Sequence, residues 1–327
     1  MPKVSICIAV YNVEKYIEQC VRSLFEQTLD DLEYIFVDDA STDASIDVML
    51  RVLEDYPHRK NQVKLLRHET NLGVAVTRKD AIAAAIGDYV IHCDPDDWVE
   101  LDMYEKIYTA AVDSGADLTI CRYYVERIGN TDTSCEVLNN GDDFVEMLLK
   151  GKVYCSLYNQ LYKRHIVKHK SIKYDDSLRV AEDWMEVVQL LNLSKTVCCI
   201  ENVLYHYRTF NEKSLTKTYH PRCLVSAITQ LGDIVEKKKY RSSLDRLKII
   251  ALMHCMFSDE ISAREWHRLW KATKRRVFFI SYPVKLKIIF CLACINYPVT
   301  KWFWKKVRER RFKINADAQD NNLHSGL

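Results

Sequence analysis

The first hundred residues alternate between two hydrophobic periodicities, and this alternation limits the possible folds more than any other feature. Residues 4–12 (VSICIAVYN) form a nearly continuous β-rich apolar run, as in a strand buried on both faces. Residues 13–27 then place the apolar pairs Tyr16/Ile17 and Cys20/Val21 at helical spacing. The pattern predicts a strand followed by an amphipathic helix.

The same strand–helix unit repeats along the next seventy residues. Ser41, Thr42 and Asp43 are available to cap the second helix. Strands and helices that alternate with short loops predict an α/β fold, in which helices flank a Rossmann-like, mostly parallel sheet. The expected strands span 32–39, 62–68 and 88–94, and the expected helices span 44–56 and 73–86.

The later part of the chain is expected to add further elements and an appendage. A helix is expected over 99–115, a strand over 116–127, and a helix with an apolar face of Trp184, Val187/Val188 and Leu190/Leu191. The expected boundaries are 1–216 for a catalytic domain with halves 1–100 and 101–216, 217–262 for a helical extension, 263–315 for a basic amphipathic segment and 316–327 for a disordered tail.

Composition indicates a folded globular protein, because 48% of the residues are hydrophobic and Gly and Pro are scarce. The twelve cysteines are scattered, and most lie in apolar runs, as small hydrophobic residues do. Neither Cys198–Cys199 nor Cys291 with Cys294 has a partner pair at zinc-site spacing. Because the N-terminus does not resemble a signal peptide, a cytoplasmic, reducing location is expected.

Positive charge is concentrated near the C-terminus. The net charge is only +2, but residues 264–313 hold fifteen Lys/Arg against two acids, so this stretch carries +13 and the rest carries −11. Its apolar centre, residues 288–299, is too short to span a bilayer. Aromatic residues among cations favour a helix lying on an anionic membrane surface. The alternative is a core-facing helix with a solvated basic face.

Polar residues follow the expected strands, at the edge where ligands bind in such folds. Asp94 and Asp96 lie two positions apart, so a Mg²⁺ or Mn²⁺ ion between them would relieve their repulsion and leave coordination positions for phosphates. Alternatively, Asp96 or Asp97 simply caps a helix beginning near Val99. No Gly-rich dinucleotide or nucleoside-triphosphate loop is present.

Four other residues have both a chemical and an ordinary interpretation. Asp38 and Asp39 can accept hydrogen bonds from a ribose or a base, or can belong to a capping loop. Arg78 can reach a diphosphate, or be an exposed helix residue. Asp183 can act as a general base, or merely favour a helix N-terminus.

Several motifs together resemble the family-2 glycosyltransferases of the GT-A fold, of the bacterial type that builds capsule, exopolysaccharide or lipopolysaccharide. The resemblance covers about two thirds of the chain. Its motifs are the sequence from Val4 to Ser45, NLGVAVTRKDAI, GDYVIHCDPDDW, YNQLYKRHIV, AEDWMEVVQLL and VLYHYRTFNEKSLT.

The resemblance implies a nucleotide-diphosphate sugar donor, most often UDP-linked, and inversion at the anomeric carbon. The implied site residues are Val10, Tyr11, Asp38 and Asp39 for the nucleoside, Asp94 for the ribose and diphosphate, Asp96 for the metal, Arg78, Arg208 and Ser214 near the diphosphate, and Asp183 as the base. Two positions depart from the common pattern, Ala9 and Pro95, and both departures keep the polar ligands.

The sequence therefore predicts a metal-dependent hexosyltransferase, peripheral on the inner face of the plasma membrane, which acts on a saccharide or lipid-linked acceptor. One alternative is a sugar-phosphate nucleotidyltransferase, whose basic Gly-rich loop is missing here. Another is a non-catalytic membrane- or nucleic-acid-binding protein. Acids at three strand ends argue against a nucleic-acid partner, because they repel a polyanion.

Overall fold

The protein is described by a computed structural model over residues 1–133, 144–150, 156–173, 182–211, 221–234, 240–255 and 262–271, together with residues 292, 298–300, 302 and 306. The chain divides into two compact units, Met1–Tyr219 and His220–Leu327. The boundary expected near Thr216 falls outside the described residues and stays a prediction. So do Ser214 and the tail from 316 to 327.

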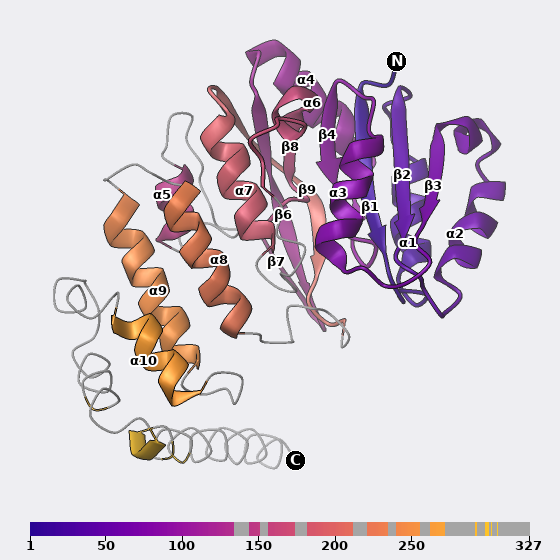
Figure 1. Ribbon diagram of the computed structural model, residues 1–327. Helices are drawn as coiled ribbons and strands as arrows, with labels where there is room; N and C mark the ends of the chain where they lie inside the picture. Colours follow the sequence, from indigo (N-terminus) through magenta and orange to yellow (C-terminus); the bar gives the residue numbers. More distant parts are fainter. Residues whose placement is uncertain are drawn as a thin grey trace, which may run out of the picture. The chain divides into compact units, whose positions relative to one another are not determined.

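The first half of unit 1 has the expected alternating architecture (Figure 1). Four parallel strands lie in the order β3-β2-β1-β4. The strands are β1 (Val4–Val10), β2 (Leu32–Asp38), β3 (Val63–Arg67) and β4 (Tyr89–His92). The connecting helices are α1 (Ile17–Phe25), α2 (Ser45–Glu54), the short 3₁₀ helix η1 (Pro57–Gln62) and α3 (Val74–Ala84).

Helices cover the two faces of this sheet separately. Alternate β1 residues such as Ile6 and Ile8 share one core cluster with Leu24 of α1, Met49 of α2 and Tyr104 of α4 (Met103–Ser114). Helix α3 packs against β1 and β2, and its buried residues are outside that cluster. A strand buried on both faces is what the continuous apolar runs predicted.

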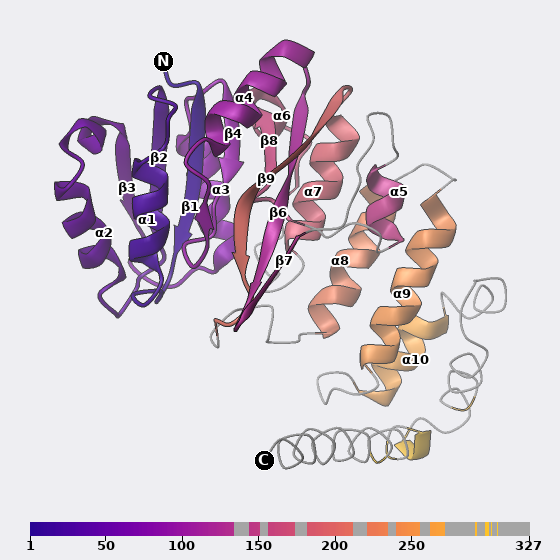
Figure 2. The same ribbon diagram turned by 180° about the vertical axis from the view of Figure 1, so that it is seen from behind.

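The second half of unit 1 makes the sheet mixed. Beyond β4 the order continues β8-β6-β9-β5, with β8 antiparallel to both of its neighbours and β9 parallel to β6 (Figure 2). The strands are β5 (Trp98–Val99), β6 (Leu118–Arg127), β7 (Asn130–Thr133), β8 (Gln160–Lys163) and β9 (Val197–Arg208), and the helices are α5 (Phe144–Leu149), α6 (Arg164–Val167) and α7 (Glu182–Leu193).

Two sequence expectations are corrected here. The helix expected from residue 99 begins at Met103, because Trp98 and Val99 pair with β9 as a short strand. Helix α7 was expected to bury one apolar stripe including Trp184 and Leu191. Those two side chains are only half-buried, whereas Glu186 and Gln189 are buried with their apolar neighbours.

Unit 2 contains three described helices, α8 (Pro221–Ile234), α9 (Arg241–Cys255) and α10 (Ala263–Lys271). Helix α9 packs against both α8 and α10. Trp266 is fully buried, and its Nε1–H donates to the Leu252 carbonyl at 3.0 Å. The expected basic segment 263–315 therefore begins with a packed helix, and most of its remainder is outside the described residues. Among the helices that are described, none has the length and apolar character needed to cross a membrane.

Candidate active site

The carboxyl ends of β1, β2 and β4 lie at one edge of the sheet. The last residues of β1 and β2, Val10 and Asp38, are paired with each other. Beyond the end of β4, the Cys93 N–H still donates to the Cys7 carbonyl of β1, so Asp94 follows directly at this edge. The residues just past β1 and β2 have left-handed backbone, with φ of 52° at Asn12 and 58° at Ala40. Such a conformation is costly for alanine and is often found at functional sites.

The residues expected to hold a nucleoside differ in how available they are. Val10 is buried, and Tyr11 is 47% exposed beside it. Asp38 accepts from the Ser41 N–H through Oδ1 at 2.9 Å, and its Oδ2 makes no hydrogen bond within the described residues. This oxygen is free to accept from a ligand.

Asp39 has an internal role. Its carboxylate accepts from the backbone N–H groups of Leu72 and Gly73, at 2.8 and 2.9 Å, and lies 2.8 Å from His68 Nδ1. It is 3% exposed. These contacts fix the loop that enters α3, so Asp39 supports the conformation of the site. Its contact with a nucleoside stays a prediction.

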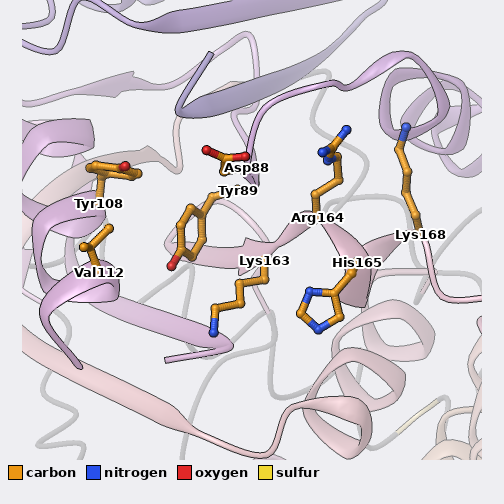
Figure 3. Close-up of a pocket in the computed structure, with 8 residues that line it drawn as sticks. All are labelled: Asp88, Tyr89, Tyr108, Val112, Lys163, Arg164, His165 and Lys168. Carbon is orange, nitrogen blue, oxygen red and sulfur yellow. The ribbon is translucent and has the colours of Figure 1, made fainter. Parts of the chain in front are cut away.

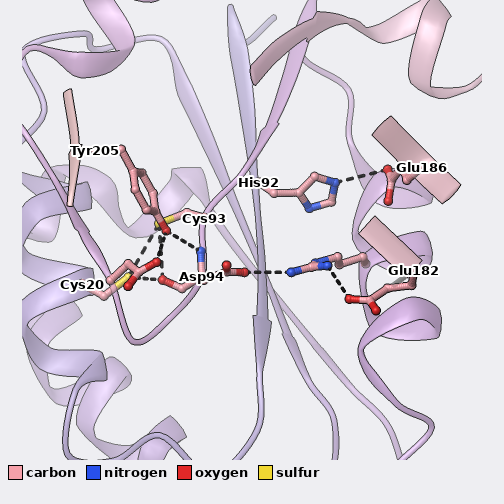
Figure 4. A network of polar contacts seen from close by, with 9 residues as sticks. Cys20, His92, Cys93, Asp94, Glu182, Glu186 and Tyr205 are labelled. Atoms are coloured by element: carbon pink, nitrogen blue, oxygen red, sulfur yellow. Dashed lines mark hydrogen bonds and ion pairs between the residues drawn. The ribbon is translucent and has the colours of Figure 1, made fainter. Parts of the chain in front are cut away.

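Arg78 joins the turn after β4 to the first turn of α7. Its guanidinium donates to Asp94 Oδ1 at 3.0 Å and to Glu182 Oε1 at 2.9 Å (Figure 4). Burial lowers the pKa of Arg78, but the surrounding carboxylates, with Asp94 and Glu182 contributing most, together outweigh it and raise the pKa above its usual value. The sequence pointed to Arg78 for a diphosphate. It did not reveal that Arg78 links Asp94 to Glu182, because Glu182 lies 104 positions after Arg78 in the sequence.

Asp183 lies next to this pair, at the start of α7. Its Oδ1 accepts from the Trp184 N–H at 2.8 Å. Burial raises the pKa of Asp183 to about 7, the Glu182 charge adds to the shift, and Arg78 opposes it. A carboxylate with a pKa near neutrality is suited to accept a proton from a hydroxyl group.

The turn from Asp94 to Asp97 is held by β9. The Asp94 N–H donates to the Tyr205 hydroxyl at 3.1 Å, and this hydroxyl donates to Asp97 Oδ2 at 2.8 Å (Figure 4). Asp97 Oδ1 accepts from the Arg208 N–H at 2.7 Å. Asp97 is 1% exposed, and burial raises its pKa well above the usual range. The sequence offered Asp97 as a possible helix cap, whereas in the structure it connects the acidic turn to β9.

Asp96 is held through one of its carboxylate oxygens. Its Oδ2 accepts from Asn211 Nδ2 at 2.7 Å. Burial and the neighbouring Asp94 charge raise the pKa of Asp96. A nearby cation would relieve both the burial cost and the repulsion.

Arg208 is enclosed near Asp96. Its Nε–H donates to the Asp96 carbonyl at 2.6 Å, and one terminal N–H donates to Gln19. The rings of Tyr16, Trp98 and Phe210 lie 4.9, 4.7 and 4.9 Å from its guanidinium carbon. Arg208 thus fixes the acidic turn, and its expected contact with a diphosphate stays a prediction.

The acidic pair fits a divalent ion that the substrate helps to bind. No cluster of three or more His, Cys, Asp or Glu side chains suited to a metal occurs among the described residues. Mg²⁺ and Mn²⁺ are commonly held by one or two carboxylates, with phosphate oxygens as the other ligands. Asp96, whose pKa is raised first by burial and then by the Asp94 charge, together with Asp94 provides such a set.

A second pair of polar side chains, a histidine and a glutamate, lies between β4 and α7. His92 Nε2 is 3.5 Å from Glu186 Oε1, and both side chains are almost fully buried (Figure 4). Among the residues that the structure describes, neither ring nitrogen of His92 has a hydrogen-bond partner. In the sequence, His92 and Glu186 each stand out as a polar residue within an apolar stretch. The sequence did not indicate that β4 and α7 bring these two residues together.

Comparison with known sequences identifies a family of relatives. The profile of the family described as "Glycosyl transferase family 2" matches residues 5–169. The "Putative glycosyltransferase EpsH" of Bacillus subtilis is 30% identical, covering 85% of this chain and 80% of that protein. The "Poly(ribitol-phosphate) beta-glucosyltransferase" of Bacillus spizizenii is 27% identical over 63% of this chain but only 32% of its own length.

Solved structures share the fold. TarS 1-349 of S. aureus, in complex with UDP-GlcNAc, has a TM-score of 0.69 at 17% identity and covers 93% of this chain and 92% of its own. The mannosyltransferase PcManGT of Pyrobaculum calidifontis, in complex with GDP-Man and Mn²⁺, has a TM-score of 0.54 at 16% identity, with coverage of 93% and 87%. The predicted α/β GT-A fold is confirmed by this likeness.

Proposed function

The chain belongs to glycosyl transferase family 2, and we propose that it transfers a hexose from a nucleoside-diphosphate donor, with inversion, to a saccharide or lipid-linked acceptor. The observation that carries this proposal is the link from Asp94 through Arg78 to Glu182, next to Asp183. It joins a donor-side carboxylate, Asp94, to Glu182, whose neighbour Asp183 has a pKa raised to about 7.

UDP is the nucleotide we propose. The support is that the TarS structure holds UDP-GlcNAc, whereas the mannosyltransferase structure holds GDP-Man and has the lower TM-score. The free Oδ2 of Asp38 is the acceptor we assign to the nucleoside. One relative is named a poly(ribitol-phosphate) beta-glucosyltransferase, which supports a saccharide-containing polymer as the product. We place its synthesis at the inner face of the plasma membrane.

The division of labour follows from the positions of the charges. Asp183 would take the proton of the acceptor hydroxyl, and a base on the face opposite the leaving group leads to inversion. Asp96, assisted by Asp94, would hold Mn²⁺ or Mg²⁺, which stabilises the negative charge of the departing nucleoside diphosphate. Arg78 holds the donor side of the site at a fixed position relative to the base side, because it bonds to Asp94 on one side and to Glu182, next to Asp183, on the other.

The test is a donor panel with paired variants. Nucleotide release from UDP-, GDP- and dTDP-sugars should favour a UDP-sugar and should depend on Mn²⁺ or Mg²⁺. Asp183→Asn and Asp96→Asn should each lower kcat by about a hundredfold or more. Asp113→Asn, on the exposed face of α4, is the matched control and should be unchanged. Wild-type transfer by both folded variants would refute the proposal.

A further inference from the structure

A basic cavity lies at the opposite edge of the sheet from the candidate active site. Tyr89 begins β4 and Asp88 precedes it, whereas Asp94 follows the other end of the strand, so roughly 15–20 Å of extended chain separates the two places. The cavity has a volume of about 640 Å³, within the range of small-molecule sites. It is lined by Asp88, Tyr89, Tyr108, Val112, Lys163, Arg164, His165 and Lys168 (Figure 3).

Cations dominate one side of this cavity. In Figure 3 the guanidinium of Arg164 and the ammonium of Lys168 point the same way. Lys168 Nζ donates to the carbonyls of Ala83 and Ala85, at 3.0 and 2.7 Å, which fixes the ammonium and leaves one N–H for a ligand.

Arg164 is the residue best placed to bind a ligand. Its backbone N–H is anchored to the Asp88 carbonyl at 2.9 Å. Its half-buried guanidinium makes no hydrogen bond or ion pair with any part of the chain that the structure describes, so its five N–H donors are available. A planar guanidinium with free donors is suited to bidentate binding of a phosphate.

The other side of the cavity is apolar and aromatic. The rings of Tyr89 and Tyr108 meet edge to face, with centroids 5.7 Å apart, and Val112 is 50% exposed beside them. Such a wall can pack against the carbon–hydrogen face of a sugar ring. A ligand that satisfies both sides carries an anion and a saccharide.

We propose that this cavity is a second binding site, for a phosphorylated saccharide, separate from the candidate donor site. Only the saccharide part of the ligand rests on the proposed function, since the anion-binding side follows from Arg164 and Lys168 alone. Asp88 is the one acidic side chain in the lining, and it weakens binding of an anion.

The experiment is calorimetric titration of the full chain with glucose 1-phosphate, in the presence of saturating UDP. Arg164→Gln should weaken binding by about tenfold or more, because it removes a charge-assisted bidentate contact. Asp88→Asn should tighten binding about two- to fivefold, a change that misfolding cannot produce. Arg51→Gln, which removes an exposed guanidinium on α2, is the matched control and should bind as wild type.

The outcomes separate this site from its competitors. Equal affinity in Arg164→Gln, or displacement of glucose 1-phosphate by UDP, would overturn the proposal. Inorganic phosphate binding as tightly as glucose 1-phosphate would overturn the saccharide assignment. Retention on vesicles containing phosphatidylglycerol, without binding of glucose 1-phosphate, would show a lipid headgroup instead and overturn it too. Binding in a chain that transfers no sugar would refute only the proposed function.

Discussion

Asp97 shows how a buried carboxylate can shape a site without facing the ligand. Its two oxygens accept from the Tyr205 hydroxyl and the Arg208 N–H. The same hydroxyl accepts from the Asp94 N–H, so one oxygen atom of β9 fixes both ends of the acidic turn. We therefore expect Tyr205 to position Asp94 and Asp96.

Tyr205→Phe tests this positioning role. Loss of the hydroxyl leaves Asp97 Oδ2 without its donor, so the turn should loosen. We expect kcat/KM to fall about five- to tenfold and the Mn²⁺ concentration for half-maximal activity to rise several-fold. Steady-state kinetics at varied Mn²⁺ measures both.

The control is Tyr34→Phe. This residue also has a buried hydroxyl, bonded to the Leu24 carbonyl at 2.6 Å, away from the acidic turn. Both variants should lose about 1–2 kcal/mol of unfolding free energy, but only Tyr205→Phe should change the metal dependence. An unchanged metal requirement in Tyr205→Phe would mean that the hydroxyl merely stabilises the fold.

Asp183 predicts opposite effects of pH on activity and on stability. Its pKa of about 7 means that the basic form gains population as the pH rises through 7, so kcat/KM should rise to a plateau above that value. Between the unfolded pKa near 3.8 and the native value, the folded state binds more protons, so rising pH costs stability.

Asp183→Asn should accordingly be inactive yet more stable than wild type at pH 8, by about 2 kcal/mol, with little difference near pH 4. Denaturant unfolding at the two pH values measures the difference. Asp113→Asn is the control, because the exposed side chain should give no pH-dependent gain. A gain of equal size at both pH values would contradict the raised pKa.

The residues of the site were predictable to different extents. Strand ends pointed to Asp38 and Asp94, because carboxyl ends of parallel strands share an edge. The partner of Asp97 was not predictable, since Tyr205 is 108 residues away and meets it through the pairing of β5 with β9. The His92–Glu186 pair was likewise hidden, because it forms only when α7 packs on β4.

At the scale of elements, local periodicity accounts for the first half of the sheet. The runs for β1 and β2 are seven residues each, apolar and separated by a helix with a clear spacing, and β4 follows in the same alternation. By contrast, β5 has two residues and β8 has four, too few to show a period. These strands exist because neighbouring strands offer backbone partners, which a local pattern cannot show.

Gly87 tests how closely β1 and β4 approach. A Cβ there would lie 2.7 Å from the Ser5 N and 2.9 Å from the Val4 carbonyl carbon, both backbone atoms that cannot move aside. Gly87→Ala should destabilise the protein by about 1–3 kcal/mol. Gly232→Ala in α8 meets nothing within 4 Å, so it should be neutral or stabilising by up to about 1 kcal/mol. Thermal unfolding of the two variants gives the comparison, and equal melting temperatures would contradict it.

At the scale of the whole molecule, the charge asymmetry is the feature that the described fold does not explain. Residues 272–313 hold twelve Lys/Arg and one acid. The preceding helix α10 is anchored in unit 2 by Trp266. A chain ending at Lys271 retains both Leu252 and Trp266 and loses most of the basic segment.

This truncation tests the predicted membrane association. Lys and Arg near an anionic leaflet contribute about 1 kcal/mol each at low salt, and the contribution is screened as salt rises. The full chain should therefore float with vesicles containing phosphatidylglycerol at low salt. About 0.5 M NaCl should reduce this binding but not abolish it, because the aromatic residues also contribute apolar contacts. Vesicles of phosphatidylcholine alone should bind it weakly. The chain ending at Lys271 should not bind any of these vesicles, while it should keep its affinity for UDP. If it floats to the same extent as the full chain, the membrane contact lies elsewhere on the molecule.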